Sequence, residues 1–311
     1  MPAELQISGR MQLTQWQKGL AFALIAPLLY ALKSVLIKFA PPTRVEFFVF
    51  FRFIFDFLLL IPFFILYRNK LHSKQLGLHS IRAIFAAISI ACSVYGIKHL
   101  ALVDAVLLES TLPLFVPLVA WAWYGKKITA SSFFILILGF AAVFILLQPK
   151  LNVLHLASLA SIGAGLCSAI TAVSIGKLST TEHPIAFLFY FNVFSAALTA
   201  IPCVCTWESN FPMDSFSFWL PFGLISLCGV LYQYAIIKAY SLIPLHITGN
   251  LSYFEVLFGA LFGWWIWAEP LSASQIFGGG ILIGSGLLML RRNQQDSAQK
   301  TVASSNKESV S

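Results

Sequence analysis

Charged side chains lie in the middle of long apolar stretches of this chain, where each costs roughly 2.5–3.5 kcal/mol to insert into a membrane. Arg52 and Asp56 are four residues apart in one such stretch, so a helix would place them on one face and within reach of each other. Two interpretations are open. The two residues form a structural ion pair that fixes the helix, or the Arg52 guanidinium binds a substrate carboxylate while Asp56 balances charge.

Two carboxylates in other apolar stretches are candidates for the same chemistry. Glu109 precedes Pro113 by one turn, and a proline frees backbone carbonyls that neighbouring groups or water must satisfy. Glu109 could therefore bind a cation or a proton, with packing as the alternative. Glu255 lies about one turn from the position that matches Glu109 when the two halves of the chain are aligned. Lys33 is too deep to reach the membrane surface easily and could neutralise one of these acids.

Polar and aromatic side chains elsewhere could complete a binding site. Aromatic rings can hold a cationic or planar ligand by cation–π contact or stacking, although packing is the alternative for each residue. The further candidates for substrate binding are Tyr232, Gln233, Asn250, Tyr253 and Asn192. The five cysteines show no metal-ligand spacing, and we expect no metal, no cofactor and no catalytic residue.

The composition indicates a membrane protein. Of the 311 residues, 59% are hydrophobic and 10% are charged, whereas a soluble domain carries about 25% charged residues. The net charge of +8 comes from Lys and Arg between apolar spans, without a basic patch that interleaves with aromatics, so we expect no nucleic acid partner.

Windows of about 20 residues predict ten membrane-spanning helices. With the N-terminus in the cytoplasm, 14 of the 20 Lys and Arg residues lie on the cytoplasmic side and 4 on the opposite side. This bias places both termini in the cytoplasm. The predicted spans are 19–38, 45–67, 82–98, 103–124, 131–148, 155–176, 184–206, 218–237, 244–267 and 273–290.

One pattern occurs twice, and the two copies carry opposite charge at the same place. Leu107–Thr129 and Asn250–Ser272 each contain an apolar helix with a carboxylate in its first half, Trp at its end and a polar hinge after it. Lys126 in the first hinge aligns with Glu269 in the second, 143 positions later. Because five helices per repeat is an odd number, the second copy should enter the membrane inverted, and the positive-inside rule then explains the reversed charge.

This repeat predicts the organisation of the chain. The second copy also carries Gly259 and Gly263 four residues apart, which predicts a close approach of another helix. The expected parts are a cytoplasmic segment 1–17, a first five-helix repeat 18–150, a second five-helix repeat 151–292 and a disordered cytoplasmic tail 293–311.

The plan resembles the drug/metabolite transporter superfamily, in particular the ten-helix proteins made of two EamA-type repeats. The resemblance covers about residues 18–292 and is carried by FFRF in the second span, STLPLF in the fourth, YFEV and WAEPLS around the ninth, and GGGILIGSG in the last. The stretches VEFFVFFRF, HSIRAIF and KAYSLIP also resemble S-adenosylmethionine uptake transporters of obligate intracellular bacteria. The chain departs from the family where Lys126 replaces the usual hinge Glu and Val256 the usual ninth-helix Pro, which leaves the behaviour of the hinges open.

The resemblance implies an all-α integral membrane protein of the bacterial inner membrane that works as a secondary transporter by alternating access. The absence of GxxxxGK[ST] argues against direct use of ATP, and the absence of HExxH or GxSxG in the spans argues against an intramembrane enzyme. We expect a small polar metabolite as substrate, an amino acid or a nucleoside-type metabolite such as S-adenosylmethionine. A drug/metabolite exporter of the same fold and a non-transporting membrane scaffold are the alternatives. The expected partners are the substrate and the lipid bilayer, with a monomer expected and a dimer as the alternative.

Overall fold

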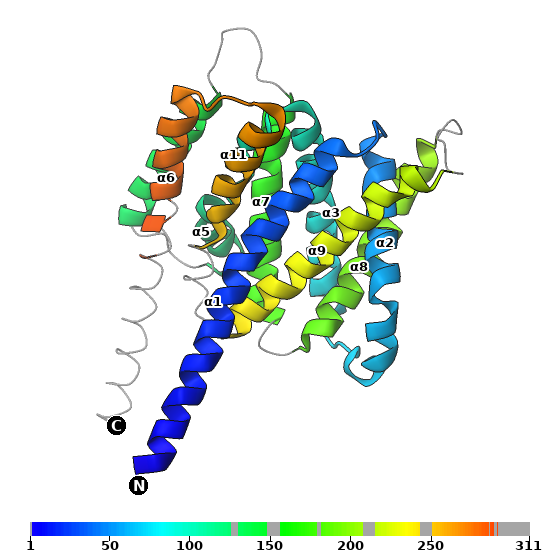
Figure 1. Cartoon of the computed structure of the whole chain (residues 1–311), viewed down its shortest axis with the longest axis vertical. Helices are drawn as coiled ribbons and strands as arrows, with labels where there is room; N and C mark the ends of the chain where they lie inside the picture. Colours follow the sequence, from blue (N-terminus) through cyan, green and yellow to red (C-terminus); the bar gives the residue numbers. More distant parts are fainter. Residues whose placement is uncertain are drawn as a thin grey trace.

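The protein is a bundle of long helices. A computed structural model describes residues 2–125, 130–147, 156–178, 182–207, 215–242 and 251–285, together with 287, 288 and 291. Within these residues the chain is helical between short connections and contains no strand. Figure 1 shows that most helices run between two opposite ends of the molecule, so the predicted all-helical architecture is confirmed.

The helices have the following bounds. The first half of the chain contains α1 Pro2–Phe39, α2 Val45–Leu66, the 3-10 helix η1 Arg68–Lys70, α3 Leu76–His99, α4 Leu102–Glu109, α5 Leu112–Tyr124 and α6 Ala130–Leu147. The second half contains α7 Leu156–Leu178, α8 Pro184–Cys205, α9 Phe216–Leu242 and α11 Phe254–Trp267, and residues 273–285 are also helical.

The surface of the bundle is apolar. In the described part of the chain, seven helices are long and apolar enough to cross a membrane, and 133–142 and 254–267 are shorter apolar helices. Large side chains such as Ile65, Val204 and Phe277 are exposed on the outside, which suits contact with lipid and not with water. The total of ten spans remains a prediction, because parts of the last two predicted spans lie outside the described residues.

Several predicted boundaries were wrong. The helix α1 begins at Pro2, so the backbone of 2–17 continues the first span and is not a separate segment. The helix α3 begins at Leu76 and not at residue 82, because the polar side chains of His79 and Arg82 are buried among partners from a distant part of the chain. Hydropathy alone cannot register such partners. The predicted tail 293–311 and both hinge lysines of the first copy lie outside the described residues.

The span predicted at 103–124 is two helices. The first, α4, ends at Glu109, Ser110 and Thr111 form a turn, and α5 begins at Leu112 with Pro113 in its first turn. Proline has no N–H to donate and fits only the first turn of a helix. The Ser110 hydroxyl donates to the Val106 carbonyl at 2.8 Å and the Thr111 hydroxyl to the Leu108 carbonyl at 2.7 Å, which satisfies carbonyls left free at the end of α4.

A second break lies at the matching position of the second half. Residues 251–252 are helical, Tyr253 is in a turn, and α11 begins at the next residue. Tyr253 follows Ser110 by 143 positions, the offset that aligns the two hinges. Gly125 and Ala268 have the same offset, and each ends a helix in left-handed backbone conformation, with φ of 64° and 51°. The two copies therefore share backbone features as well as sequence.

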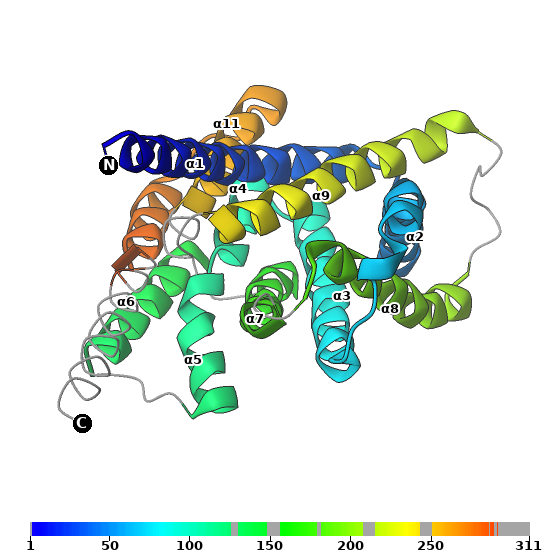
Figure 2. The same cartoon turned by 90° about the horizontal axis from the view of Figure 1, so that it is seen from below.

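The two halves of the chain interdigitate. The helix α1 packs against α9 and α11, α2 against α8, and α3 against α7 (Figures 1 and 2). The break-forming helices α4 and α11 also pack together. A Cβ at Gly259 would meet Val106, and one at Gly263 would lie 2.8 Å from a Glu269 carboxylate oxygen. The predicted close approach at these glycines is confirmed.

Candidate functional site

Five ionisable side chains gather between the two halves, close to the two helix breaks. Lys33 lies within electrostatic range of the other four, and the two glutamates lie within range of each other. The structure thus brings together residues that the sequence places in four separate helices. This group is called the central cluster and consists of Lys33 on α1, Arg52 and Asp56 on α2, Glu109 at the end of α4 and Glu255 in the first turn of α11.

Lys33 is held by aromatic rings. Its side chain is buried, and its Nζ lies 4.1 Å from the ring centroid of Tyr30 and 5.6 Å from that of Tyr232. The two ring centroids are 5.4 Å apart. Among the described carboxylates none forms an ion pair with Lys33. The ammonium is therefore stabilised by cation–π contacts together with the longer-range field of the acids.

Each glutamate of the central cluster is bound by a hydroxyl group. Ser93 on α3 donates to Glu109 Oε2 at 2.8 Å, and the Tyr232 hydroxyl forms a hydrogen bond with Glu255. The Tyr30 hydroxyl also lies near Glu109. It is buried, and it makes no hydrogen bond of good geometry to a described residue. One donor next to the two acids thus remains unsatisfied, which is uncommon for a buried hydroxyl.

Arg52 and Asp56 form the ion pair that their spacing predicts. Arg52 Nη2 and Asp56 Oδ2 are 3.7 Å apart, and both side chains are buried. This separation exceeds a hydrogen bond, and Arg52 Nε and Asp56 Oδ1 have no partner among the described residues. The guanidinium packs against Gly229 of α9, where a Cβ would lie 3.1 Å from Nη2. Gly229 was not predicted, since a glycine in an apolar helix does not reveal which side chain lies over it.

The remaining candidates are placed less closely around the central cluster. Asn192 on α8 is buried and donates to the Leu188 carbonyl of its own helix at 2.8 Å, which leaves its Oδ1 without a partner in the described chain. Tyr253 lies in the second break with its hydroxyl buried and likewise unsatisfied. Gln233 is half-buried beside Tyr232, and Asn250 lies outside the described residues. Within those residues no group of three His, Cys, Asp or Glu side chains could hold a metal ion.

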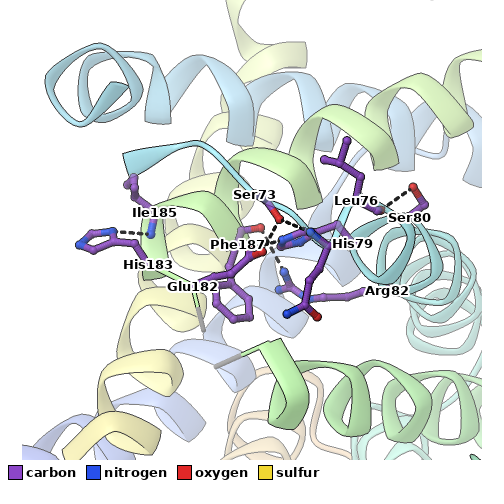
Figure 3. A network of polar contacts seen from close by, with 10 residues as sticks. Ser73, Leu76, His79, Ser80, Arg82, Glu182, His183, Ile185 and Phe187 are labelled. Carbon is purple, nitrogen blue, oxygen red and sulfur yellow. Dashed lines mark hydrogen bonds and ion pairs between the residues drawn. The ribbon is translucent and has the colours of Figure 1, made fainter. Parts of the chain in front are cut away.

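A second polar network, which the sequence did not predict, joins the turn before α3 to the start of α8 (Figure 3). Glu182 accepts a hydrogen bond from the Ser73 hydroxyl and pairs with His79 Nε2. The Ser73 hydroxyl in turn accepts from the Gln75 N–H at 3.0 Å. We call Ser73, His79 and Glu182 the α3–α8 link, because it connects the two halves of the chain.

Arg82 lies beside this link and strengthens the same contact between helices. Its Nη1 donates to the Phe187 carbonyl at 3.0 Å, and its guanidinium lies over the rings of Phe187 and Phe191 at 5.3 and 4.9 Å from their centroids. The start of α8 itself is capped by His183, whose Nδ1 accepts from the Ile185 N–H at 3.3 Å. The polar letters at the edge of the predicted third span were the only sequence signal for this region.

The opposite end of the bundle carries a third network around Glu269. One carboxylate oxygen pairs with Lys38 at the end of α1, and the other accepts from the Leu102 N–H at 2.9 Å. Glu269 therefore caps the N-terminus of α4, where a negative charge is favoured. The Lys38 ammonium also donates to the Leu100 carbonyl at 3.3 Å and lies 4.7 Å from the Trp267 ring centroid. We call Lys38, Leu102 and Glu269 the α1–α4–α11 junction.

Comparison with known proteins supplies a family. The model of the EamA-like transporter family matches the chain twice, over residues 17–148 and 155–291. The second match begins close to the predicted boundary between the repeats. The helix breaks described above therefore lie at corresponding places in two copies of one family unit.

Individual relatives are distant but cover most of the chain. The pseudopaline exporter CntI of Pseudomonas aeruginosa is 26% identical over 92% of this chain and 100% of its own length. An S-adenosylmethionine uptake transporter of Rickettsia prowazekii is 23% identical over 93% of this chain and 97% of its own. A riboflavin transporter of Vibrio cholerae is 23% identical over 72% of both chains.

A solved structure shares the fold. It superimposes with a TM-score of 0.61 and 16% identity, and the match covers 90% of this chain and 98% of that one. At this identity the likeness concerns the fold alone. The arrangement of helices around the central cluster is therefore one that an experimentally determined protein also adopts.

Proposed function

This chain belongs to the EamA-like transporter family, and we propose that it is a secondary transporter which carries a small polar metabolite through the space around the central cluster. The observation that carries this proposal is the position of five ionisable side chains beside two helix breaks in a chain of this hydrophobicity. Transporters place substrate sites at discontinuous helices near the middle of the membrane, where the two repeats meet. A protein with a purely structural role would have no need of so many costly charges.

The proposed topology has ten spans, with the two repeats inverted and both termini in the cytoplasm of a bacterial cell. The Lys and Arg distribution and the two matches of the family model support it. In this orientation the α3–α8 link lies on the cytoplasmic side and the α1–α4–α11 junction on the outer side. The two networks would then bind the two halves together at opposite ends of the transport path.

The proposed substrate is zwitterionic. Arg52 suits a carboxylate group because its guanidinium can form two parallel hydrogen bonds, and the pair of Glu109 and Glu255 suits a positive group. The ring of Tyr232 could stack on a planar group. Further contacts are proposed from Gln233, Asn192, Asn250 and Tyr253.

The named relatives support a metabolite without deciding which one. One is named an exporter and others are named for S-adenosylmethionine uptake or riboflavin transport. An amino acid or a nucleoside-type metabolite such as S-adenosylmethionine fits the mixed charge of the central cluster. Export of a related compound by the same fold is the second candidate, which the similarity to the pseudopaline exporter favours.

Reconstitution into liposomes tests the proposal. Counterflow would be measured with labelled S-adenosylmethionine, riboflavin and a set of amino acids, for the wild-type protein and for Glu109→Gln, Glu255→Gln and Glu46→Gln. Glu46 lies in the first turn of α2, outside the central cluster, and is the matched control. We expect saturable exchange of at least one compound, lost in the first two variants and kept in the third. No exchange of any compound by the wild type would contradict transport, and normal exchange in both cluster variants would contradict the site.

A further inference from the structure

We propose that the central cluster is one positive charge short of neutrality, and that Glu109 and Glu255 together bind either one proton or the cationic group of a substrate. The two exclude each other, so that binding of a cationic group releases a proton. This inference rests on the proposed function and adds to it a substrate class and a coupling. The substrate carries an ammonium or sulfonium group, and a proton moves in the opposite direction.

The first argument is the charge count. The central cluster contains three carboxylates and two cations, which leaves one negative charge in excess. The other buried cations of the described chain are engaged elsewhere: Arg82 with the Phe187 carbonyl, and Lys98 with the carbonyls of Pro41 and Thr43. An unbalanced charge in the middle of a membrane is strongly unfavourable. One further positive charge is therefore required.

The second argument is the set of groups that face the two glutamates. Tyr30 faces them from α1, Ser93 and Cys92 from α3, and Tyr232 from α9. All of these are neutral hydroxyl or thiol groups. The described surroundings thus supply hydrogen-bond donors but no third cation, and the required charge must come from a proton or from a ligand.

The third argument is the unsatisfied Tyr30 hydroxyl. Ser93 already donates to Glu109, and Tyr232 to Glu255. The Tyr30 hydroxyl is buried beside the same carboxylates and has no hydrogen-bond partner in the described chain. Such a group is expected to have a partner. It is therefore placed to bind a ligand that reaches the two acids.

The fourth argument identifies the ligand chemistry. The rings of Tyr30 and Tyr232 already hold one cation, the Lys33 ammonium, beside the two carboxylates. Aromatic faces next to acids are the surroundings in which proteins bind ammonium and sulfonium groups. A second cationic group that enters this place would neutralise the remaining negative charge. A proton bound there beforehand would then leave to water.

Infrared spectroscopy of the purified protein tests the charge count without any substrate, because a protonated carboxyl group absorbs apart from a carboxylate. We expect one protonated buried carboxyl at pH 7 in the wild type and none in Glu109→Gln or Glu255→Gln. A second should appear in Lys33→Met, since that change removes one cation. Glu46→Gln should match the wild type. Size-exclusion profiles identify variants that do not fold, and the wild-type band itself remains decisive. Its absence, or its persistence in both glutamine variants, would overturn the proposal.

A matched pair of ligands tests the exclusion. S-adenosylmethionine and S-adenosylhomocysteine differ by one methyl group and by the positive charge of the sulfonium. In weakly buffered protein solution with an indicator dye, we expect S-adenosylmethionine to release about one proton per molecule bound. S-adenosylhomocysteine should bind at least about tenfold more weakly and release none. Binding of S-adenosylmethionine without proton release would overturn the exclusion. If neither ligand binds, the proposed nucleoside-type substrate is wrong, whereas the infrared band alone decides the charge count.

Discussion

The Thr111 hydroxyl occupies the space in which Gly165 would carry a side chain. Through this contact the middle of α7 supports the break between α4 and α5. A Cβ at Gly165 would also lie 2.9 Å from the Glu109 carbonyl and 3.4 Å from the Leu112 nitrogen, and these are backbone atoms that cannot turn aside. The position of Glu109 in the central cluster therefore depends on a glycine in the other half of the chain.

We predict that Gly165→Ala lowers stability by about 1–3 kcal/mol, the usual cost of overpacking, and also reduces transport because it displaces Glu109. The control is Gly163→Ala on the same helix, where a Cβ would meet nothing within 4 Å. It should behave as the wild type or be slightly more stable, since alanine favours a helix. Thermal unfolding in detergent and counterflow would measure both effects. Equal behaviour of the two variants would show that α7 does not support the break.

The two left-handed helix ends give a prediction of opposite signs. Ala268 adopts a backbone conformation that disfavours residues with a Cβ by about 1–2 kcal/mol, whereas Gly125 adopts it without this cost. We predict that Ala268→Gly is stabilising by up to about 1 kcal/mol, because the greater freedom of glycine in the unfolded chain offsets part of the gain. Gly125→Ala should be destabilising, although space for its Cβ is open. Reversible unfolding in mixed micelles would measure both changes, and equal signs would contradict the explanation.

The α1–α4–α11 junction predicts that an exchange of charges fails. In an ordinary ion pair, Lys38→Glu combined with Glu269→Lys restores the attraction. Here Glu269 also accepts from the Leu102 N–H, and a lysine at this N-terminus would be repelled by the helix dipole. We expect the double variant to remain about 1–2 kcal/mol less stable than the wild type. Thermal unfolding decides this, and full recovery would mean that the cap contributes nothing.

The α3–α8 link predicts a large loss of stability from one substitution. Glu182→Ala removes the partner of both Ser73 and His79, which are buried. Leaving buried polar groups without partners should cost about 2–4 kcal/mol. Ser80→Ala is the control, because this exposed hydroxyl donates only to the Leu76 carbonyl of its own helix, at 3.0 Å. Chemical unfolding would measure the difference, and similar stability of both variants would remove the link from the account.

The sequence predicted the central cluster because charges in apolar spans are conspicuous. Arg52 and Asp56 were paired correctly from their spacing, and Lys33 was assigned to the acids that it faces. The break after Glu109 was only partly predicted, as a turn loosened by Pro113. The matching break at Tyr253 was missed, since Val256 gives no local reason for a helix to stop there.

Contacts between distant segments could not be predicted. Glu182 lies in a polar connection between spans, and nothing in its neighbourhood indicates that it meets Ser73 and His79 more than 100 residues earlier. Gly229 and Gly165 likewise have their roles because of the side chain or backbone that lies over them. Hydropathy and local spacing describe one helix at a time, whereas these contacts depend on how the helices pack.

Access to the central cluster from the two faces of the membrane tests the central claim most directly. Cys92 is a natural reporter, because it is half-buried on α3 and faces Glu109. A variant that keeps it and carries alanine in place of the other four cysteines would be treated with an impermeant maleimide, in right-side-out and in inverted vesicles. We predict that Cys92 reacts from both faces, and that Glu269→Gln changes the ratio by weakening the α1–α4–α11 junction. Reaction from one face only, or from neither, would contradict a site that opens to the two sides in turn.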